Sequence, residues 1–412
     1  MLLSICASIV LLFTVMGRLA ANPGMKIKIT DKGLQYARKI GVNLLEQKIK
    51  EFQLPDETGK IDLMGWLDYK VSRLQLIDVG LPNSSAEFIP NIGIRFSTDV
   101  SVSLVGELEV SLGLLYSAGT FNLNISMLSA TFVVGFLHND GRPTVKPISC
   151  NSTLKDFEIT FHGSSSWLHR MFIERTKGEI RKAFSKKVCS HFVSLIERLE
   201  TMDQTALQQV DHYVAFDYSL VREPVITANS IEWPIKGIVY DRQHRKPPPY
   251  DVQPFNLPDI TDLMLYVGVS EDVLNTMGFA YFVAGALQID ITDDKLPEDI
   301  SLRLNTSNLS LLLPETASVG AQVYISEMRL RGSVHLKSFD LVLKQSKVGN
   351  IQVKALDTIL TIVFKKNVLP KLNVSLYRGK ALLILHKVSL PNAIIKINKG
   401  MLMLGTDLEY RG

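Results

Sequence analysis

The chain lacks the short motifs that mark common enzyme classes. It contains no Gly-x-Ser-x-Gly nucleophile elbow, no His-Glu-x-x-His zinc helix and no Gly-x-x-x-x-Gly-Lys phosphate loop. Its eight histidines are scattered, and His212, His244 and His335 show no spacing typical of metal ligands. We therefore predict no catalytic residue, no metal site and no cofactor.

A strong charge of one sign is also missing. The 45 basic and 41 acidic residues leave a formal net charge of +4, which is too small to indicate nucleic-acid binding. This charge is compatible with weak contact with an anionic membrane surface. Hydrophobic residues make up 46% of the chain. So apolar a composition predicts a large core, an interior site for lipid, or both.

Long hydrophobic runs are confined to the N-terminus. Residues 2–15 are mostly apolar, and small residues follow at Gly17, Ala20 and Ala21. We interpret residues 1–21 as a signal peptide rather than an uncleaved anchor, because the apolar stretch is short for a membrane span. The mature protein is then secreted and extracellular. Six Asn-x-Ser/Thr sequons become candidates for glycosylation: Asn83, Asn124, Asn151, Asn305, Asn308 and Asn373.

Cysteine is scarce, with three residues in 412, and Cys6 lies in the leader. Only Cys150 and Cys189 remain, so the mature protein can form one disulfide. Cys150 closes a strand-like run, and Cys189 lies late in a long amphipathic helix. We predict that they are bonded and that the bridge joins this helix to a sheet in an oxidising compartment.

Most of the chain carries a strand pattern. Apolar and polar residues alternate in residues 71–77, 100–105, 121–125, 325–330 and 334–339. Alternation with a period of two predicts sheets with one buried face. Two long helical patterns interrupt these strands, so the fold class is α+β.

The first helix is predicted to begin after Thr30, a plausible N-cap, and to end near Gln53, before Pro55. The second begins after the serine cluster at 164–166, and a third, shorter helix is predicted over about residues 354–364. The apolar positions of the first two helices are candidates for contact with acyl chains. They are Leu34, Ala37, Ile40, Leu44, Leu45, Phe172, Ile180, Phe184 and Val188.

Two interpretations of these apolar positions stay open. They can belong to an ordinary core, or they can line an apolar tunnel between helix and sheet. The opposite face of the second helix is basic, with Arg181, Lys182, Lys186 and Lys187. That face is either a solvated surface or a contact for anionic head groups. Near the middle of the chain, the triple proline 247–249 imposes an extended segment, which we interpret as an interdomain linker.

Short motifs follow one order along nearly the whole chain. They are Asn22-Pro-Gly24, residues 29–37, Phe88-Ile-Pro-Asn-Ile-Gly-Ile-Arg-Phe96, residues 141–147 leading into Cys150 with its partner Cys189, the linker residues 247–250, Met264-Leu-Tyr-Val-Gly-Val-Ser270, residues 274–276 and 284–290, and residues 402–410. Together they resemble the bactericidal/permeability-increasing and lipopolysaccharide-binding protein family.

The resemblance implies an elongated, boomerang-shaped molecule. Two antiparallel β-barrels, each with a long helix and an apolar pocket for phospholipid tails, would be joined by a central sheet. On this basis, residues 22–236 are the N-terminal lipid-binding barrel, 237–258 the proline-rich linker and 259–412 the C-terminal lipid-binding barrel. The implied partner is phospholipid or lipopolysaccharide, and the family is not enzymatic by its core fold.

Two departures from the family pattern affect the expected function. The hairpin over residues 105–116 has no basic residue and two acidic ones, Glu107 and Glu109, whereas antibacterial members carry Lys and Arg there. The chain is also short relative to the family: at residues 294–318 it lacks a helix and strands of the family's second barrel, so this barrel is expected to be shortened.

The predicted function is a secreted lipid binder in innate immune defence against Gram-negative bacteria. The alternatives are an extracellular lipid carrier without antibacterial activity and a structural surface protein.

Overall fold

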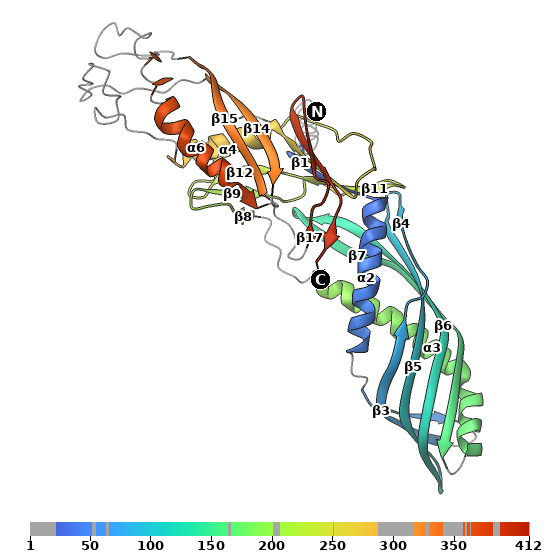
Figure 1. The fold of residues 1–412 in the computed structure, drawn as a ribbon. Coiled ribbons are helices and arrows are strands. Elements are labelled where there is room, and N and C mark those ends of the chain that lie inside the picture. Colours follow the sequence, from blue (N-terminus) through green and yellow to red (C-terminus); the bar gives the residue numbers. More distant parts are fainter. Residues whose placement is uncertain are drawn as a thin grey trace, which may run out of the picture.

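The computed structural model describes residues 22–51, 55–62, 66–163, 166–200, 207–249, 251–286, 316–326, 329–340, 357–358, 361–362, 364–381 and 388–411. The predicted signal peptide, Asn305, Asn308 and most of the 294–318 segment lie outside them. The molecule is elongated, with an arm at each end and a sheet between them (Figure 1). The fold is α+β, as predicted. Within the described residues, no helix combines the length and apolarity needed to cross a membrane.

A curled antiparallel sheet forms the N-terminal arm. Its strands follow the order β2 (Glu57–Asp62), β3 (Trp66–Gly80), β5 (Gly93–Leu112), β6 (Leu115–Asn139) and β7 (Arg142–Gly163), and β4 (Ser84–Ile89) pairs with β5. The alternating segments 71–77, 100–105 and 121–125 lie in these strands, which confirms those predictions. The expectation that Cys150 closes its strand was wrong, because β7 continues to Gly163.

Two long helices accompany this sheet. The first, α2 (Asp31–Lys50), has Thr30 as its N-cap, and the Thr30 side chain accepts a hydrogen bond from the Gly33 N–H. The predicted N-cap is therefore confirmed. The second, α3 (Ser166–Glu200), begins at the serine cluster as predicted and contacts β7 along the arm.

The central sheet combines distant parts of the chain. Its order is β10 (Val225–Ile226), β11 (Ser230–Ile235), β1 (Met25–Thr30), β13 (Leu265–Ser270), β19 (Met401–Thr406) and β18 (Ile394–Asn398), and every pair is antiparallel. The N-terminal strand β1 lies between strands that follow it by about 200 residues or more. This pairing joins the two arms.

Residues 251–263, here called the strap, lie against the central sheet. Phe255, Leu257, Ile260 and Leu263 pack against the buried side chains of β13 and β19. The half of the predicted linker that follows the triple proline is thus a docked segment. It is also held by Lys28, whose Nζ lies 3.3 Å from Asp259 Oδ1.

Smaller elements form the C-terminal arm. A three-stranded sheet contains β12 (Ile238–Asp241), β9 (Val214–Asp217) and β8 (Leu207–Gln209), and α4 (Glu271–Val283) packs on β12 and β9. A second sheet contains β14 (Thr316–Ser326), β15 (Arg329–Asp340) and β16 (Lys380–Ala381). The short strands β17 (Val388–Ser389) and β20 (Glu409–Tyr410) pair with each other.

Two predictions for this arm were wrong. The expected strand 325–330 is divided, because β14 ends at Ser326 and antiparallel β15 begins at Arg329. Alternation alone does not reveal a change of direction. The third helix does not end at residue 364: the π-helix η2 (Phe364–Val368) and the helix α6 (Leu369–Arg378) follow. Pro370 follows directly after η2 in the first turn of α6, where it has no backbone N–H to donate.

Candidate lipid-binding site

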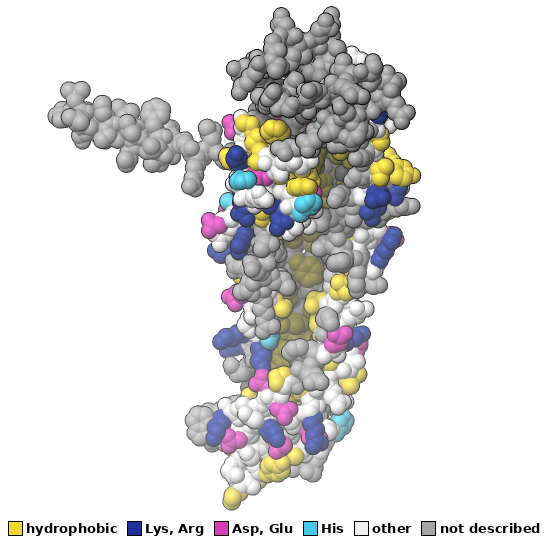
Figure 2. Space-filling view, turned by 90° about the vertical axis from the view of Figure 1, so that its left-hand side faces the viewer, with side chains coloured by type: hydrophobic (Ala, Val, Ile, Leu, Met, Phe, Trp, Pro, Cys, Tyr) yellow, Lys and Arg dark blue, Asp and Glu magenta, His cyan; other side chains and the backbone are white. Residues whose placement is uncertain are grey.

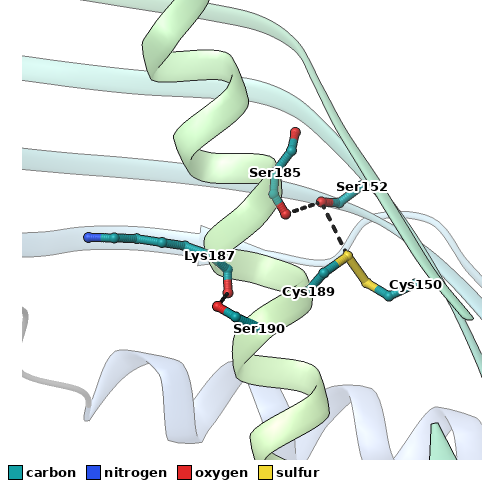
Figure 3. The surroundings of a disulfide bond; sticks show 6 residues. All are labelled: Cys150, Ser152, Ser185, Lys187, Cys189 and Ser190. Carbon is teal, nitrogen blue, oxygen red and sulfur yellow. Dashed lines mark hydrogen bonds between the residues drawn. A yellow bond between two sulfur atoms is a disulfide. The ribbon is translucent and has the colours of Figure 1, made fainter.

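Helix α3 is fixed to the edge strand of the N-terminal arm. Cys150 of β7 and Cys189 of α3 form a disulfide with a Cα–Cα distance of 5.6 Å (Figure 3), as predicted. Ser152 of β7 also donates a hydrogen bond from Oγ to the carbonyl oxygen of Ser185, one turn before Cys189 on α3, at 2.8 Å. A covalent and a polar contact therefore set the position of α3 against the sheet.

The apolar ridge of α3 faces the core of this arm. Ile180, Phe184 and Val188 are half-buried and pack against a cluster of fully buried side chains from β3, β5, β6 and β7. Ile173 belongs to that cluster with 8% of its surface exposed. Sequence reasoning missed Ile173, although its position two helical turns before Ile180 was a usable signal. The side chain of Phe172 lies outside the described part of the structure.

The predicted positions on α2 have different environments. Leu34 is buried in a second cluster with Ala86, Phe88, Ile226 and Ile231. Ile40 is half-buried, Ala37 is exposed, and Leu44 and Leu45 expose 41% and 40% of their surfaces. The described contacts thus place Leu34 apart from the α3 residues. Contact of the α2 residues with acyl chains stays a prediction.

A hollow runs along one face of the molecule. Figure 2 shows it in the middle of the view, with hydrophobic side chains inside it and charged side chains on both flanks. The charged side chains are accessible to water, whereas the apolar ones lie deeper. Such an arrangement suits an amphipathic ligand whose tail enters and whose polar end stays outside.

The far end of the N-terminal arm is apolar. Leu114, in the turn between β5 and β6, is fully exposed, and Leu115 and Tyr116 at the start of β6 expose 48% and 63% of their surfaces. Gly113 has a φ of +59°, a backbone conformation that glycine adopts readily. These three consecutive apolar residues were not predicted as a feature of the hairpin, for which only the charge was considered.

The two acidic residues near this end are paired with cations of the neighbouring strand. Glu107 lies 2.9 Å from Arg73, and Glu109 lies 3.6 Å from Lys70, both in β3. Tyr116 donates a hydrogen bond to Glu109, and desolvation together with the Glu109 charge raises the pKa of Tyr116. The hairpin alone is acidic, as the sequence indicates, but these pairs balance its charge locally.

Two surface depressions of about 340 and 390 Å³ flank Glu109. The first is lined by residues of β2, β3 and β5, among them Lys60, Tyr69 and Lys70, and by Tyr116. The second lies over β5, β6 and the end of β7. Both are shallow and open, and their linings mix apolar side chains with charged ones such as Glu109.

The basic residues of α3 are partly engaged within the arm. Lys187 forms an ion pair with Glu57 of β2. The Arg181 guanidinium lies over the Phe157 ring at 5.7 Å and donates to the carbonyl oxygen of Lys155. These contacts reduce the charge that this face offers to an anionic head group.

The comparisons with known proteins cover both halves of the chain. Residues 33–202 match the N-terminal domain of the LBP / BPI / CETP family, and residues 208–319 and 316–410 match its C-terminal domain. A bactericidal permeability-increasing protein of Sebastes schlegelii is 31% identical over 99% of this chain and 100% of its own length. A lipopolysaccharide-binding protein of Bos taurus is 28% identical over 96% and 95%.

A solved structure gives the same result for the fold. The crystal structure of a lipopolysaccharide binding protein superposes with a TM-score of 0.64 and 24% identity, covering 95% of this chain and all of that one. This likeness supports the architecture of two arms around a central sheet. The two matched domains and the 31% identical relative place the chain in the LBP / BPI / CETP family.

Proposed function

We propose that this protein is a secreted lipid binder that holds the acyl chains of phospholipid or lipopolysaccharide between α3 and the curled sheet of the N-terminal arm. One observation carries the proposal: Ile180, Phe184 and Val188 face the apolar core of the arm yet stay half-buried. The printed names of the relatives, which include lipopolysaccharide-binding protein, support the same ligand class.

Half-burial leaves apolar surface for a ligand to cover. Each methylene that moves from water into such a site contributes about 0.8 kcal/mol. An acyl chain contains many methylenes, so a partly filled site is sufficient for stable binding. The polar end of the ligand would then lie at the surface, where charged side chains are available.

The biological role we propose is innate immune defence against Gram-negative bacteria. A second role, extracellular lipid transport without antibacterial activity, is favoured by the far end of the N-terminal arm. Its carboxylates are paired with Arg73 and Lys70, and its tip is apolar at Leu114. A neutral, apolar tip suits a zwitterionic lipid surface as well as an anionic one.

The test is native mass spectrometry of the secreted protein, combined with organic extraction and lipid analysis. We compare the wild type with Ile180→Trp, which adds bulk where the acyl chain is proposed to lie. Leu195→Trp is the matched control, because Leu195 lies on the same helix with 56% of its surface exposed. Thermal unfolding confirms that both variants are folded.

The proposal expects bound lipid in the wild type and in Leu195→Trp, and a clearly lower lipid load in Ile180→Trp. An unchanged lipid load in folded Ile180→Trp would place the lipid elsewhere. A wild-type protein without any extractable lipid, which also takes up none from vesicles, would refute the proposed function.

A further inference from the structure

Two sequons in the N-terminal arm point to the outer face of its sheet. Asn124 is exposed in β6 between the buried residues Leu123 and Ile125, so its side chain points away from the core. Asn151 is exposed in β7 between Cys150 and Ser152, which contact α3. Because side chains alternate along a strand, Asn151 faces away from α3.

A third sequon lies on the same face. Asn83, in the exposed connection between β3 and β4, donates from Nδ2 to Asp99 Oδ2 at 3.2 Å. Asp99 also accepts from Ser129 Oγ at 2.7 Å. In the strand register, Asp99 of β5 pairs with Ser129 of β6, and Ser129 pairs with Thr153 of β7. Thr153 is the hydroxyl residue of the Asn151 sequon. The Asn83 and Asn151 sequons thus occupy neighbouring positions on the outer face.

Asn373 has a different environment. It is half-buried in α6, its Oδ1 accepts the backbone N–H of Val334 at 2.7 Å, and its Nδ2 donates to the Val334 carbonyl oxygen at 3.0 Å. Both ends of this carboxamide bond to the backbone of β15. A sugar on Nδ2 would have to fit between the helix and the strand, so the carboxamide serves as a clamp between them.

We infer that Asn83, Asn124 and Asn151 carry N-linked glycans on one outer face of the N-terminal arm, and that Asn373 does not. The inference rests on the secretion included in the proposed function. In the reaction, Nδ2 forms a bond to the anomeric carbon of an oligosaccharide carried on a polyprenyl pyrophosphate. The bond from that carbon to the pyrophosphate oxygen breaks, the oxygen keeps the electron pair, and an amide proton passes to a base of the transferase.

This placement assigns the two faces of the arm to different tasks. Glycans are bulky and hydrated, so they keep the outer face in solvent. The face with α3 remains open for lipid. Any surface to which this arm binds therefore meets the helix side or the tip rather than the outer side of the sheet.

The test is a site-by-site map of glycan occupancy on the full chain, expressed with its own leader in mammalian cells. An amidase that releases N-glycans in heavy-oxygen water marks each occupied asparagine as labelled aspartate, which peptide mass spectrometry detects. Single variants Asn83→Gln, Asn124→Gln and Asn151→Gln should each lose one glycan from the intact mass. Asn122→Gln is the matched control, since Asn122 is exposed on the same strand as Asn124 but is not in a sequon.

Asn373 needs two variants. Ser375→Ala removes the sequon but keeps Asn373, and it should leave the mass of the attached glycans unchanged. Asn373→Ser removes the clamp and should lower the melting temperature. A glycan on Asn373 would overturn the inference. The absence of glycans from both Asn124 and Asn151 would overturn it as well. Lipid extraction from the same preparations is independent of these sites, so a failure of the proposed lipid binding would leave the glycan map intact.

Discussion

Asp211 shows how a single carboxylate joins two elements of the C-terminal arm. It lies in the connection between β8 and β9, where its side chain accepts the N–H groups of Tyr213 and Val214, and it also accepts the hydroxyl of Tyr281 from α4 at 2.6 Å. Burial opposes ionisation of Asp211, but these hydrogen bonds outweigh burial and lower its pKa. Burial and the Asp211 charge raise the pKa of Tyr281.

These shifts predict a pH-dependent effect of Tyr281→Phe. At neutral pH the variant should lose about 1–3 kcal/mol of stability, because a hydrogen bond to a charged group is lost. Because the pKa of Asp211 is lower in the folded state than in the unfolded state, its ionised form stabilises the fold at pH values above the unfolded-state pKa near 4. This stabilisation is lost as the pH falls through the folded-state pKa. The deficit should therefore shrink at strongly acidic pH. Urea denaturation at neutral and at strongly acidic pH measures this loss of stability. Tyr324→Phe, at an exposed tyrosine, is the control. An equal loss at both pH values would contradict this account.

The disulfide supports a second prediction at the residue scale. Replacing Cys150 and Cys189 together by serine should lower the free energy of unfolding by about 2–5 kcal/mol. The bridge joins positions 39 residues apart and so restricts the conformations of the unfolded chain. Denaturation of the oxidised wild type and the double variant measures the loss. Ser190→Ala, an exposed neighbour on α3, is the control. Alkylation of both thiols in unreduced, denatured wild type would show that the bridge is absent.

At the scale of elements, the strap depends on a glycine in the strand beneath it. A Cβ at Gly268 of β13 would lie 2.7 Å from Leu257 and 2.8 Å from Phe255, both of which pack the strap onto the sheet. A Cβ at Gly278 of α4 would meet nothing within 4 Å. The same chemical change thus meets a close contact at one position and open space at the other.

We therefore predict opposite effects for two alanine substitutions. Gly268→Ala should destabilise the protein by about 1–3 kcal/mol, because the strap must shift to relieve overpacking, and should make the strap more sensitive to proteases. Gly278→Ala should stabilise it by about 0.5–1 kcal/mol, because alanine restricts the unfolded chain and favours the helix. Thermal unfolding and limited proteolysis are the measurements. Destabilisation of similar size in both variants would show that the close contact between Gly268 and the strap does not determine the effect.

The success of the sequence predictions differed between elements for physical reasons. The first two helices begin where a capping threonine and a serine cluster predicted, since capping is a local property. The reversal between β14 and β15 was missed because alternation continues through it. The docking of the strap depends on side chains from β13 and β19, which are remote in sequence. Local patterns therefore revealed the elements but not how distant ones pack.

The candidate site was predictable to a similar degree. The α3 ridge could be identified because Ile180, Phe184 and Val188 follow helical spacing, and they do face the core of the arm. The different burial of Leu34 and Leu44 on α2 could not be predicted, because it depends on where that helix passes the central sheet. The ion pairs of the tip join residues more than 30 positions apart, and no local pattern encodes them.

At the scale of the whole molecule, the apolar tip supports a prediction about membrane contact. Leu114→Asp should weaken binding to phosphatidylcholine vesicles by about tenfold or more, because burial of a leucine side chain contributes about 1.5–3 kcal/mol. The melting temperature should not change, since Leu114 is fully exposed. Vesicle flotation at low and high salt measures binding. The control is Ile77→Asp, which changes an exposed isoleucine of β3 away from the tip. Equal binding by the two variants would exclude the tip from the contact.

The composition of the central sheet also has a consequence for the order in which the protein can be completed. Strand β1 is synthesised first, yet it pairs with β11 and β13, and β13 pairs in turn with β19 near residue 400. The first strand to leave the ribosome must therefore wait for most of the polypeptide before its partners exist. The N-terminal sheet, whose strands follow one another closely, can form during this interval. Closure of the middle of the molecule is thus a late step, and it requires a chain that has been translated almost to its end.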